Sequence, residues 1–198
     1  SVRTDITTQG NTAFSNFMTD SEVGTDEHNI GLDLTYTHKL ENGGSFSAAA
    51  HYTRFNQERD QKVATNYFDS AGENVQNINF NTSSGQNIEI FTGQLDFNSS
   101  LGEMSFDAGA KVSNINSNSG INFSNAESLD DLYDNLSDDF YYDETVSAVY
   151  INTSRDWEKW SAQVGLRGEY TDLLGVSLST NQRNRQEYFE LFPTAYLQ

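Results

Sequence analysis

The chain has 198 residues, a formal net charge of −18 and no cysteine. The lack of cysteine excludes a disulfide framework and a thiolate metal site, and the acidity argues against a nucleic-acid partner, because no basic patch can neutralise phosphates. Aromatic residues make up 13% of the chain, too many for a disordered acidic segment. No apolar run reaches the length of a membrane-spanning helix, but a spanning β-strand needs only every second residue to be apolar.

The first predicted pair of strands covers residues 29–40 and 45–57. In both segments apolar residues alternate with polar ones, and only a β-strand sorts alternate residues onto opposite faces. The Glu-Asn-Gly-Gly turn at 41–44 has the glycines that a tight hairpin needs. We predict that a long polar loop follows over 58–85.

A second pair of alternating segments covers 86–99 and 103–115, with a short turn at 99–102. A long acidic loop is then expected over 116–139. The two pairs repeat one pattern, which indicates an all-β chain of antiparallel strands.

The next predicted strand, 140–153, is less regular. Val146, Ala148 and Tyr150 are in phase on its apolar face, although apolar residues also occur on the other parity. A short turn at 154–159 leads into the strand that follows.

The clearest strand is 160–170, where apolar and polar residues alternate almost without exception. Trp160 and Tyr170 close its apolar face at both ends. Ten residues at about 3.3 Å each, tilted by about 40°, span roughly 25 Å, the height of the lipid-facing band of an outer-membrane barrel. A soluble antiparallel sheet would alternate in the same way.

A loop over 172–186 and a last strand from Glu187 complete the chain. Proline cannot donate a hydrogen bond to a neighbouring strand, so we expect this last strand to be irregular or exposed near Pro193. Residues 1–28 are expected to hold part of an earlier strand, visible near 2–8, and its loop.

The predicted connections alternate between short and long. In outer-membrane barrels the short turns are periplasmic and the long loops are extracellular, so this rhythm favours a barrel over a soluble sandwich. The turns near 42, 101 and 156 would be periplasmic, and the loops at 58–85, 116–139 and 172–186 would be extracellular.

Aromatic residues occur at two heights of the predicted strands, as the two interfacial girdles of a barrel require. They could instead be packing in cross-strand pairs; we favour the girdles. The predicted interfacial aromatics are Phe46, Phe97, Tyr150 and Trp160 near the short turns, and Tyr52 and Tyr170 near the long loops.

The polar parity of the strands would line the interior of a barrel. These side chains could contact a plug or a substrate, but we give more weight to the simpler interpretation that most of them solvate the lumen or pack against a plug. The predicted lumen-facing residues are Asp33, His51, Gln94, Asp96, Asp107, Lys111, Gln163, Arg167 and Glu169.

No pattern in the chain indicates catalysis, a metal centre or a cofactor. The three histidines have no paired ligand spacing, and Arg167 with Glu169 is better explained as an ion pair. The acidic stretch 130–139 does not match a calcium-binding loop, so a solvated loop is favoured and weak Ca²⁺ binding is a minor hypothesis.

Three segments, 142–150, 160–172 and 188–197, resemble the barrel of outer-membrane TonB-dependent receptors of the Bacteroidota type. These segments are strand and turn patterns, so the resemblance concerns the fold more than any substrate. It implies a plug domain, energy delivered by TonB, and a surface lipoprotein as a further candidate partner beside outer-membrane lipid.

We therefore predict an antiparallel up-and-down transmembrane β-barrel, of which residues 1–198 form a single fragment of about seven or eight strands, without the plug. The predicted function is nutrient uptake in the outer membrane of a Gram-negative cell, not enzymatic catalysis. The alternatives are a plug-less porin-like or structural barrel, and a soluble secreted β-sandwich that binds glycans.

Overall fold

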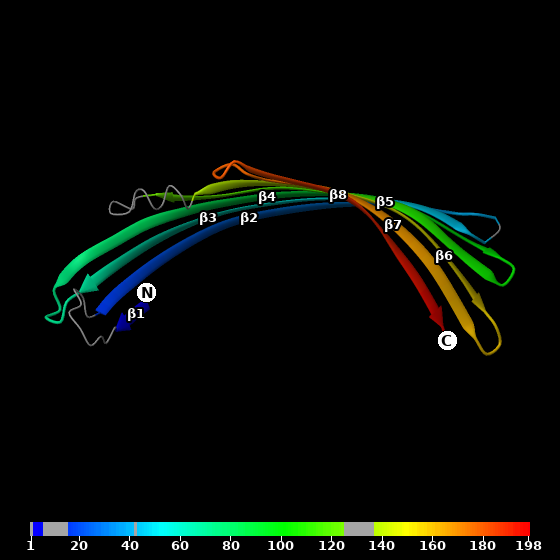
Figure 1. Cartoon of the computed structure of the whole chain (residues 1–198), viewed down its shortest axis with the longest axis horizontal. Helices are drawn as coiled ribbons and strands as arrows, with labels where there is room; N and C mark the ends of the chain where they lie inside the picture. Colours follow the sequence, from blue (N-terminus) through cyan, green and yellow to red (C-terminus); the bar gives the residue numbers. More distant parts are fainter. Residues whose placement is uncertain (1, 6–15, 42, 125–136) are drawn as a thin grey trace.

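The computed structural model describes residues 2–5, 16–41, 43–124 and 137–198. Its eight strands form one sheet in chain order, and each strand pairs antiparallel with the next. Figure 1 shows the strands running side by side along an arch. This up-and-down order confirms the predicted fold class. Within the described ranges all strands belong to this sheet, which argues against the two packed sheets of a β-sandwich.

The strands are long, and most continue well past the predicted boundaries. Their bounds are β1 (Val2–Asp5), β2 (Asn16–Lys39), β3 (Ser45–Phe68), β4 (Asn74–Leu101), β5 (Met104–Ser124), β6 (Asp138–Asp156), β7 (Ser161–Ser177) and β8 (Gln182–Leu197). The described part contains no helix long and apolar enough to cross a bilayer.

The predicted long loops are the main error of the sequence interpretation. Most of 58–85 is paired strand, because only 69–73 separates β3 from β4. Most of 172–186 is also strand, since β7 and β8 are joined at 178–181. The third loop, 116–139, belongs to β5 up to Ser124, and its centre lies outside the described residues.

The physical reason for this error is that backbone hydrogen bonds do not depend on an apolar face. Over 74–89 the residues of both parities are mostly Asn, Ser, Thr and Gln, so the contrast that marks a strand in the sequence disappears. The backbone of this segment nevertheless continues the ladder with β3. The extra residues therefore lengthen the strands at one end of the sheet.

The turns at the opposite end are tight, as predicted. Gly102 has a φ of 62° in the two-residue connection between Leu101 and Met104, which face each other in the ladder. A two-residue hairpin needs positive φ, which glycine adopts without steric cost. Gly43 has a φ of 84° in the β2–β3 turn.

Pro193 lies on β8, an edge of the sheet, and the strand there is exposed but regular. Ser161 and Gln198 exchange both backbone hydrogen bonds. Bonded pairs recur at every second position, so the pair Leu166 and Pro193 falls between them. The nitrogen of Pro193 therefore faces the open edge, and the missing donor costs no hydrogen bond to β7.

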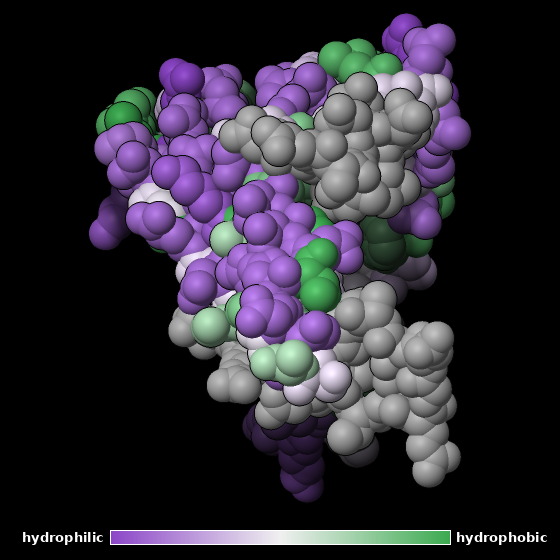
Figure 2. All heavy atoms as spheres, turned by 90° about the vertical axis from the view of Figure 1, so that its left-hand side faces the viewer, coloured by the Kyte–Doolittle hydropathy of each residue, from purple (hydrophilic) through white to green (hydrophobic). Residues whose placement is uncertain are grey.

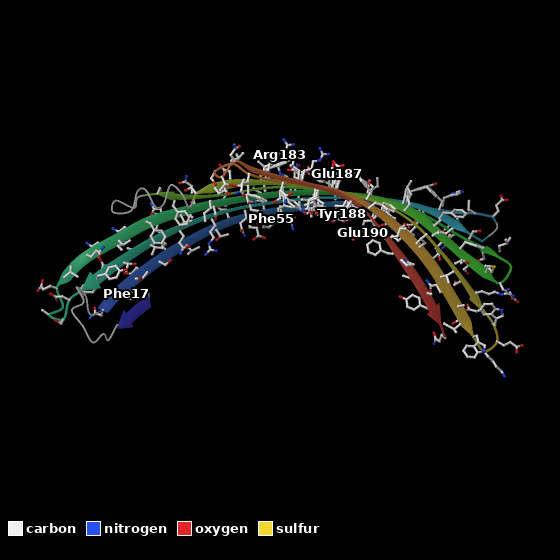
Figure 3. All side chains as sticks on the ribbon, viewed as in Figure 1. Phe17, Phe55, Arg183, Glu187, Tyr188 and Glu190 are labelled. Carbon is white, nitrogen blue, oxygen red and sulfur yellow. The ribbon has the colours of Figure 1, made fainter. Side chains whose placement is uncertain are left out.

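The two faces of the sheet differ, because cross-strand partners share a face. Figure 3 shows Phe55, Tyr188 and Glu190 on the concave side of the arch and Arg183 on the convex side. Between the short turns and the middle of the strands, the convex face carries the apolar residues. Leu34 and Val149 on this face are 72% and 64% exposed. Such a large exposed apolar surface needs a partner outside the sheet.

Beyond this apolar zone the strands continue at one end of the sheet, the end opposite the short turns. The convex side chains of the projecting part are mainly Asn, Asp, Glu and Arg. Figure 2 looks onto this end of the sheet and shows a mostly hydrophilic surface. The convex face of this outer half of the sheet therefore resembles the water-exposed surface of a soluble protein.

Candidate functional site

All nine predicted lumen-facing residues lie on the concave face. The ladder places Asp33 opposite His51, and Gln94 opposite Lys111. Glu169 lies two strands further along the row that holds Gln94 and Lys111. Arg167 lies in the neighbouring row, two strands from Gly109. The structure thus brings separate sequence segments into one polar wall, and contact of this wall with a plug or substrate remains a prediction.

The sequence interpretation assigned alternate residues of β6 to the wrong faces of the sheet. Tyr150 pairs with Gly109 and with Arg167, so it lies on the concave face and cannot be an interfacial aromatic on the lipid side. Val149 and Ile151 carry the convex face instead, and both are more than half exposed. Both parities of this strand are apolar, so only pairing with β5 and β7 fixes its orientation.

Tyr150 is the centre of a hydrogen-bonded group on the concave wall. Its hydroxyl donates to Asp96, and Gln94 Nε2 donates to the two oxygens of the same carboxylate at 3.1 and 2.9 Å. The guanidinium of Arg167 lies 5.9 Å from the centre of the Tyr150 ring, a cation–π contact, and also bonds Glu169. The carboxylate, the phenol and the ion pair therefore hold one another in place.

A hollow of about 380 Å³ lies beside this group. Its wall combines amide, hydroxyl, cationic and aromatic side chains, which suits contact with a polar surface. Lys111 carries no ion pair within the described part of the chain, so its ammonium is available to an occupant. The lining residues are Gln94, Lys111, Tyr150, Asn152, Leu166, Arg167, Phe192 and Thr194.

Two glycines that the sequence interpretation missed shape this wall. A Cβ on Gly109 would collide with the phenol of Tyr150 and would lie 2.7 Å from the carbonyl oxygen of Leu95. A Cβ on Gly165 would collide with Asn152 and would lie 2.7 Å from Thr194 Oγ1. Each glycine lets a larger side chain of the neighbouring strand lie across it.

A second polar group joins β2 and β3. His51 Nδ1 lies 2.5 Å from Asp33 Oδ1, and Thr53 Oγ1 lies 2.8 Å from His51 Nε2. Both ring nitrogens of the histidine are thus engaged by oxygen atoms, which fixes the ring orientation on the concave wall.

The aromatics of the convex face lie at two levels, apart from Tyr150. Phe46 and Phe97 pair with each other in the ladder, close to the short turns, and Trp160 lies in one of these turns. Tyr52 and Tyr170 lie at the far end of the apolar zone. This arrangement agrees with two girdles, while contact with the bilayer interfaces remains a prediction.

Between these levels the convex face has a shallow apolar groove of about 680 Å³. Its floor is made of small residues and its sides of larger, mostly apolar ones. The floor consists mainly of Ala48, Ala50, Gly93, Ala110, Ser147 and Gly168, and the sides of Leu34, Tyr36, Phe91, Leu95, Val112, Val149, Tyr170 and Phe189.

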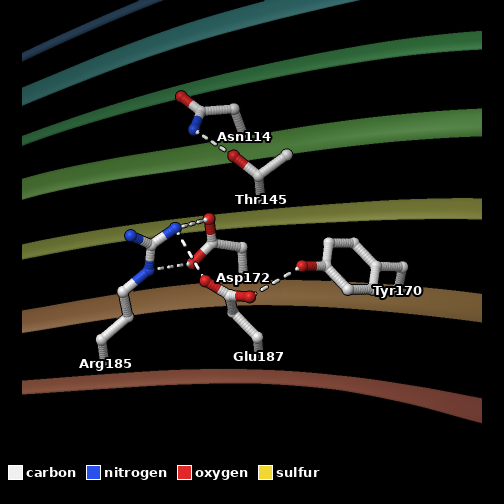
Figure 4. A network of polar contacts seen from close by, with 6 residues as sticks. All are labelled: Asn114, Thr145, Tyr170, Asp172, Arg185 and Glu187. Atoms are coloured by element: carbon white, nitrogen blue, oxygen red, sulfur yellow. Dashed lines mark hydrogen bonds and ion pairs between the residues drawn. The ribbon is translucent and has the colours of Figure 1, made fainter.

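A polar network marks the outer limit of the apolar zone (Figure 4). Arg185 Nε and Nη2 donate to the two oxygens of Asp172 at 3.1 and 2.8 Å, and Nη2 also bonds Glu187 at 2.8 Å. The phenol of Tyr170 donates to Glu187 at 3.2 Å. The hydrogen bond to Asp172 and the two carboxylate charges raise the pKa of Arg185. The change from Tyr170 to Asp172 thus separates the apolar zone from the polar one.

We expect Arg185→Ala to lower the free energy of unfolding slightly at low salt, because Asp172 and Glu187 face each other in the ladder and would repel. High salt should reduce the effect. The measurement is urea unfolding of the full-length protein in liposomes at two ionic strengths. Arg183→Ala is the control, since Arg183 lies on the same face without an ion pair in the described ranges. Equal effects of both changes would contradict the assignment.

The metal hypothesis gains no support from the part of the chain that is described. Within it, no three His, Asp or Glu side chains are grouped so that they could hold an ion. The acidic stretch 130–139 lies mostly outside the described residues. Asp138, at its end, accepts hydrogen bonds from Ser179 and Ser177, which lower the pKa of Asp138.

Comparison with known proteins identifies the family. Residues 38–198 match the Outer membrane protein beta-barrel family, and the chain belongs to it. No curated protein matches the sequence. The predicted outer-membrane location and the barrel class are thereby confirmed, and the soluble β-sandwich alternative is wrong.

Solved structures show distant similarity. The ferric citrate transporter FecA in the unliganded form is 12% identical, with a TM-score of 0.43 over 78% of this chain and 24% of its own. The alcaligin receptor FauA from Bordetella pertussis is 10% identical, with a TM-score of 0.42 over 93% and 39%. The outer membrane protease OmpT from Escherichia coli is 10% identical, with a TM-score of 0.38 over 86% and 62%. The chain thus spans only part of each of these proteins.

Proposed function

We propose that the chain forms part of the wall of an outer-membrane TonB-dependent receptor that takes up a nutrient. The observation that carries this proposal is the contrast between the two faces across one set of strands. The convex face is apolar up to Tyr170, and the concave face at the same height carries the group around Asp96 and Tyr150. A barrel wall between lipid and a polar interior requires this contrast.

In this proposal residues 1–198 belong to a single barrel domain, and a plug from the same polypeptide covers the concave wall. Lys111 and the hollow beside Tyr150 would then contact the plug or a passing solute. The short turns would be periplasmic and the projecting strand ends extracellular. We propose a surface lipoprotein as a further partner at the projecting end, and we propose that the receptor is of the Bacteroidota type.

The mechanism that follows has three steps. The projecting strands capture a solute outside the membrane, TonB delivers energy to the plug, and the plug rearranges so that the solute passes along the polar wall. The barrel residues would position the solute and the plug without forming or breaking a covalent bond, so we propose a transporter and not an enzyme.

Two measurements on the full-length protein test this function. We expect the purified protein to bind the periplasmic domain of TonB, and to give no steady conductance in planar bilayers because the plug closes the lumen. A plug-less porin would show steady conductance and no TonB binding, and that result would replace the proposal with the porin-like alternative.

A further inference from the structure

The apolar side chains change faces along the strands. Near the short turns they lie on the convex face, but beyond the level of Asp172 the convex face is mostly polar, with Ile30, Leu174 and Val176 among its apolar exceptions. The concave face at this level carries Phe55, Ile88, Ile90 and Ile115. We call these four residues the inner apolar patch. Phe55 pairs with Ile88, and Ile90 pairs with Ile115, so the four side chains are contiguous.

The inner apolar patch is accessible although it lies outside the lipid-facing zone. All four of its residues are only half-buried, and Figure 3 shows Phe55 on the concave side of the arch. Lipid cannot reach this face if it lines the lumen, so the apolar surface there serves something inside the barrel.

A carboxylate borders the inner apolar patch. Glu144 lies directly between Ile115 and Leu173 in the ladder. It accepts a hydrogen bond from Tyr142 but has no ion pair with any residue in the described ranges. The hydrogen bond to Glu144 raises the pKa of Tyr142 to about 12, so the phenol keeps its proton. A negative charge between apolar side chains is stabilised by a cation.

The rest of the concave face has the same sign of charge. Carboxylates outnumber basic side chains on it, so an approaching cation is attracted and an anion is repelled. The carboxylates are Glu27, Asp33, Asp96, Asp107, Asp138, Glu144, Asp156, Glu169 and Glu190, and the basic residues are Lys39, Arg59, Lys111 and Arg167.

We propose that the concave wall beyond the lipid-facing zone binds an apolar cation. The positive group of this solute lies against Glu144, and its apolar group covers Phe55, Ile88, Ile90 and Ile115. The proposal rests on the proposed function in one respect, namely that the concave face is the lumen.

The test uses the full-length receptor in lipid nanodiscs with an environment-sensitive fluorophore on Gln86→Cys. Gln86 lies on the same face as Ile88, two residues further out. Tetraphenylphosphonium should produce a saturable fluorescence change. Tetraphenylborate, which has the same shape and the opposite charge, should not. The same label on Asn87→Cys, on the convex face, should respond to neither ion.

Two acid-to-amide changes at adjacent positions compare the effect of a charge on the concave face with that of a charge on the convex face. Glu144→Gln should weaken tetraphenylphosphonium binding roughly 5–10-fold, because it removes the charge and keeps the shape. Asp143→Asn should leave binding unchanged, since Asp143 lies on the convex face, where it bonds Asn116. Ile88→Asn should also weaken binding by reducing the apolar contact.

Folding is checked by heat-modifiable electrophoretic mobility, so that only folded variants are compared. Equal binding by wild type and Glu144→Gln, or no saturable response at position 86, would overturn the proposal. TonB binding is measured on the same samples. If TonB binding persists while tetraphenylphosphonium binding is absent, this inference fails and the proposed function stands; if TonB binding is absent, the proposed function fails.

Discussion

Leu166→Arg should lower the free energy of unfolding in a bilayer by roughly 2–4 kcal/mol. Leu166 lies on the convex face, 47% exposed, in the same row as Phe97, Ala108 and Ile151. This row is in the lower half of the apolar zone, so a guanidinium there would lie within hydrocarbon. The measurement is denaturant unfolding of the refolded full-length protein in liposomes.

The matched control is Gln163→Arg. Gln163 lies on the same strand and on the concave face, where it pairs with Ser154 and Tyr196. A new arginine at this position can stay in a polar interior, so we expect a change within about 0.5 kcal/mol. Equal destabilisation by the two arginines would contradict the assignment of the convex face to lipid.

Gly109→Val should lower the free energy of unfolding by about 1–3 kcal/mol through overpacking. The added side chain would displace the Tyr150 phenol and crowd the backbone oxygen of Leu95. Displacing the phenol also removes its hydrogen bond to Asp96. The same liposome unfolding assay measures this change.

Gly109→Val combined with Tyr150→Ala should recover part of the lost stability, because the smaller side chain removes one of the two collisions. Gly85→Val is the control, since a Cβ on Gly85 meets no atom within 4 Å. It should be neutral or slightly stabilising. If Gly109→Val were tolerated as well as Gly85→Val, the packing of Tyr150 across Gly109 would be wrong.

The half of the strands next to the short turns could be predicted from the sequence, because lipid and lumen impose opposite chemistry on alternate residues. The polar parity of 160–170 carries Gln163, Arg167 and Glu169, and the ladder places all three on one face. Turn chemistry located the short connections, since glycine at 43 and 102 satisfies positive φ.

The outer half could not be predicted in the same way because its environment differs. Once water lies on the convex side, both parities can be polar, as in 74–89, and the alternation weakens. The strand persists there through the ladder with its neighbours. The inner apolar patch was missed because its four residues fall at the ends of the predicted strands 45–57, 86–99 and 103–115, on the parity that was expected to be polar.

The prediction of which residues of β6 lie on which face was wrong for a more local reason. Val146, Ala148 and Tyr150 form an apolar series, but Val149 and Ile151 belong to the other parity. Side-chain character alone cannot choose between two apolar parities. The neighbouring strands decide, because Tyr150 must share a face with Arg167. The group around Asp96 depends on that choice.

The central claim is that one face of β7 contacts lipid up to Tyr170 and water from Asp172 outwards. Single cysteines along 162–176, each carrying a fluorophore, test it through quenching by nitroxide-labelled lipids in the bilayer. We predict strong quenching at 162, 164, 166, 168 and 170, and weak quenching at the odd positions and at 172, 174 and 176. Quenching that is independent of parity, or that continues unchanged at even positions beyond 172, would contradict the account.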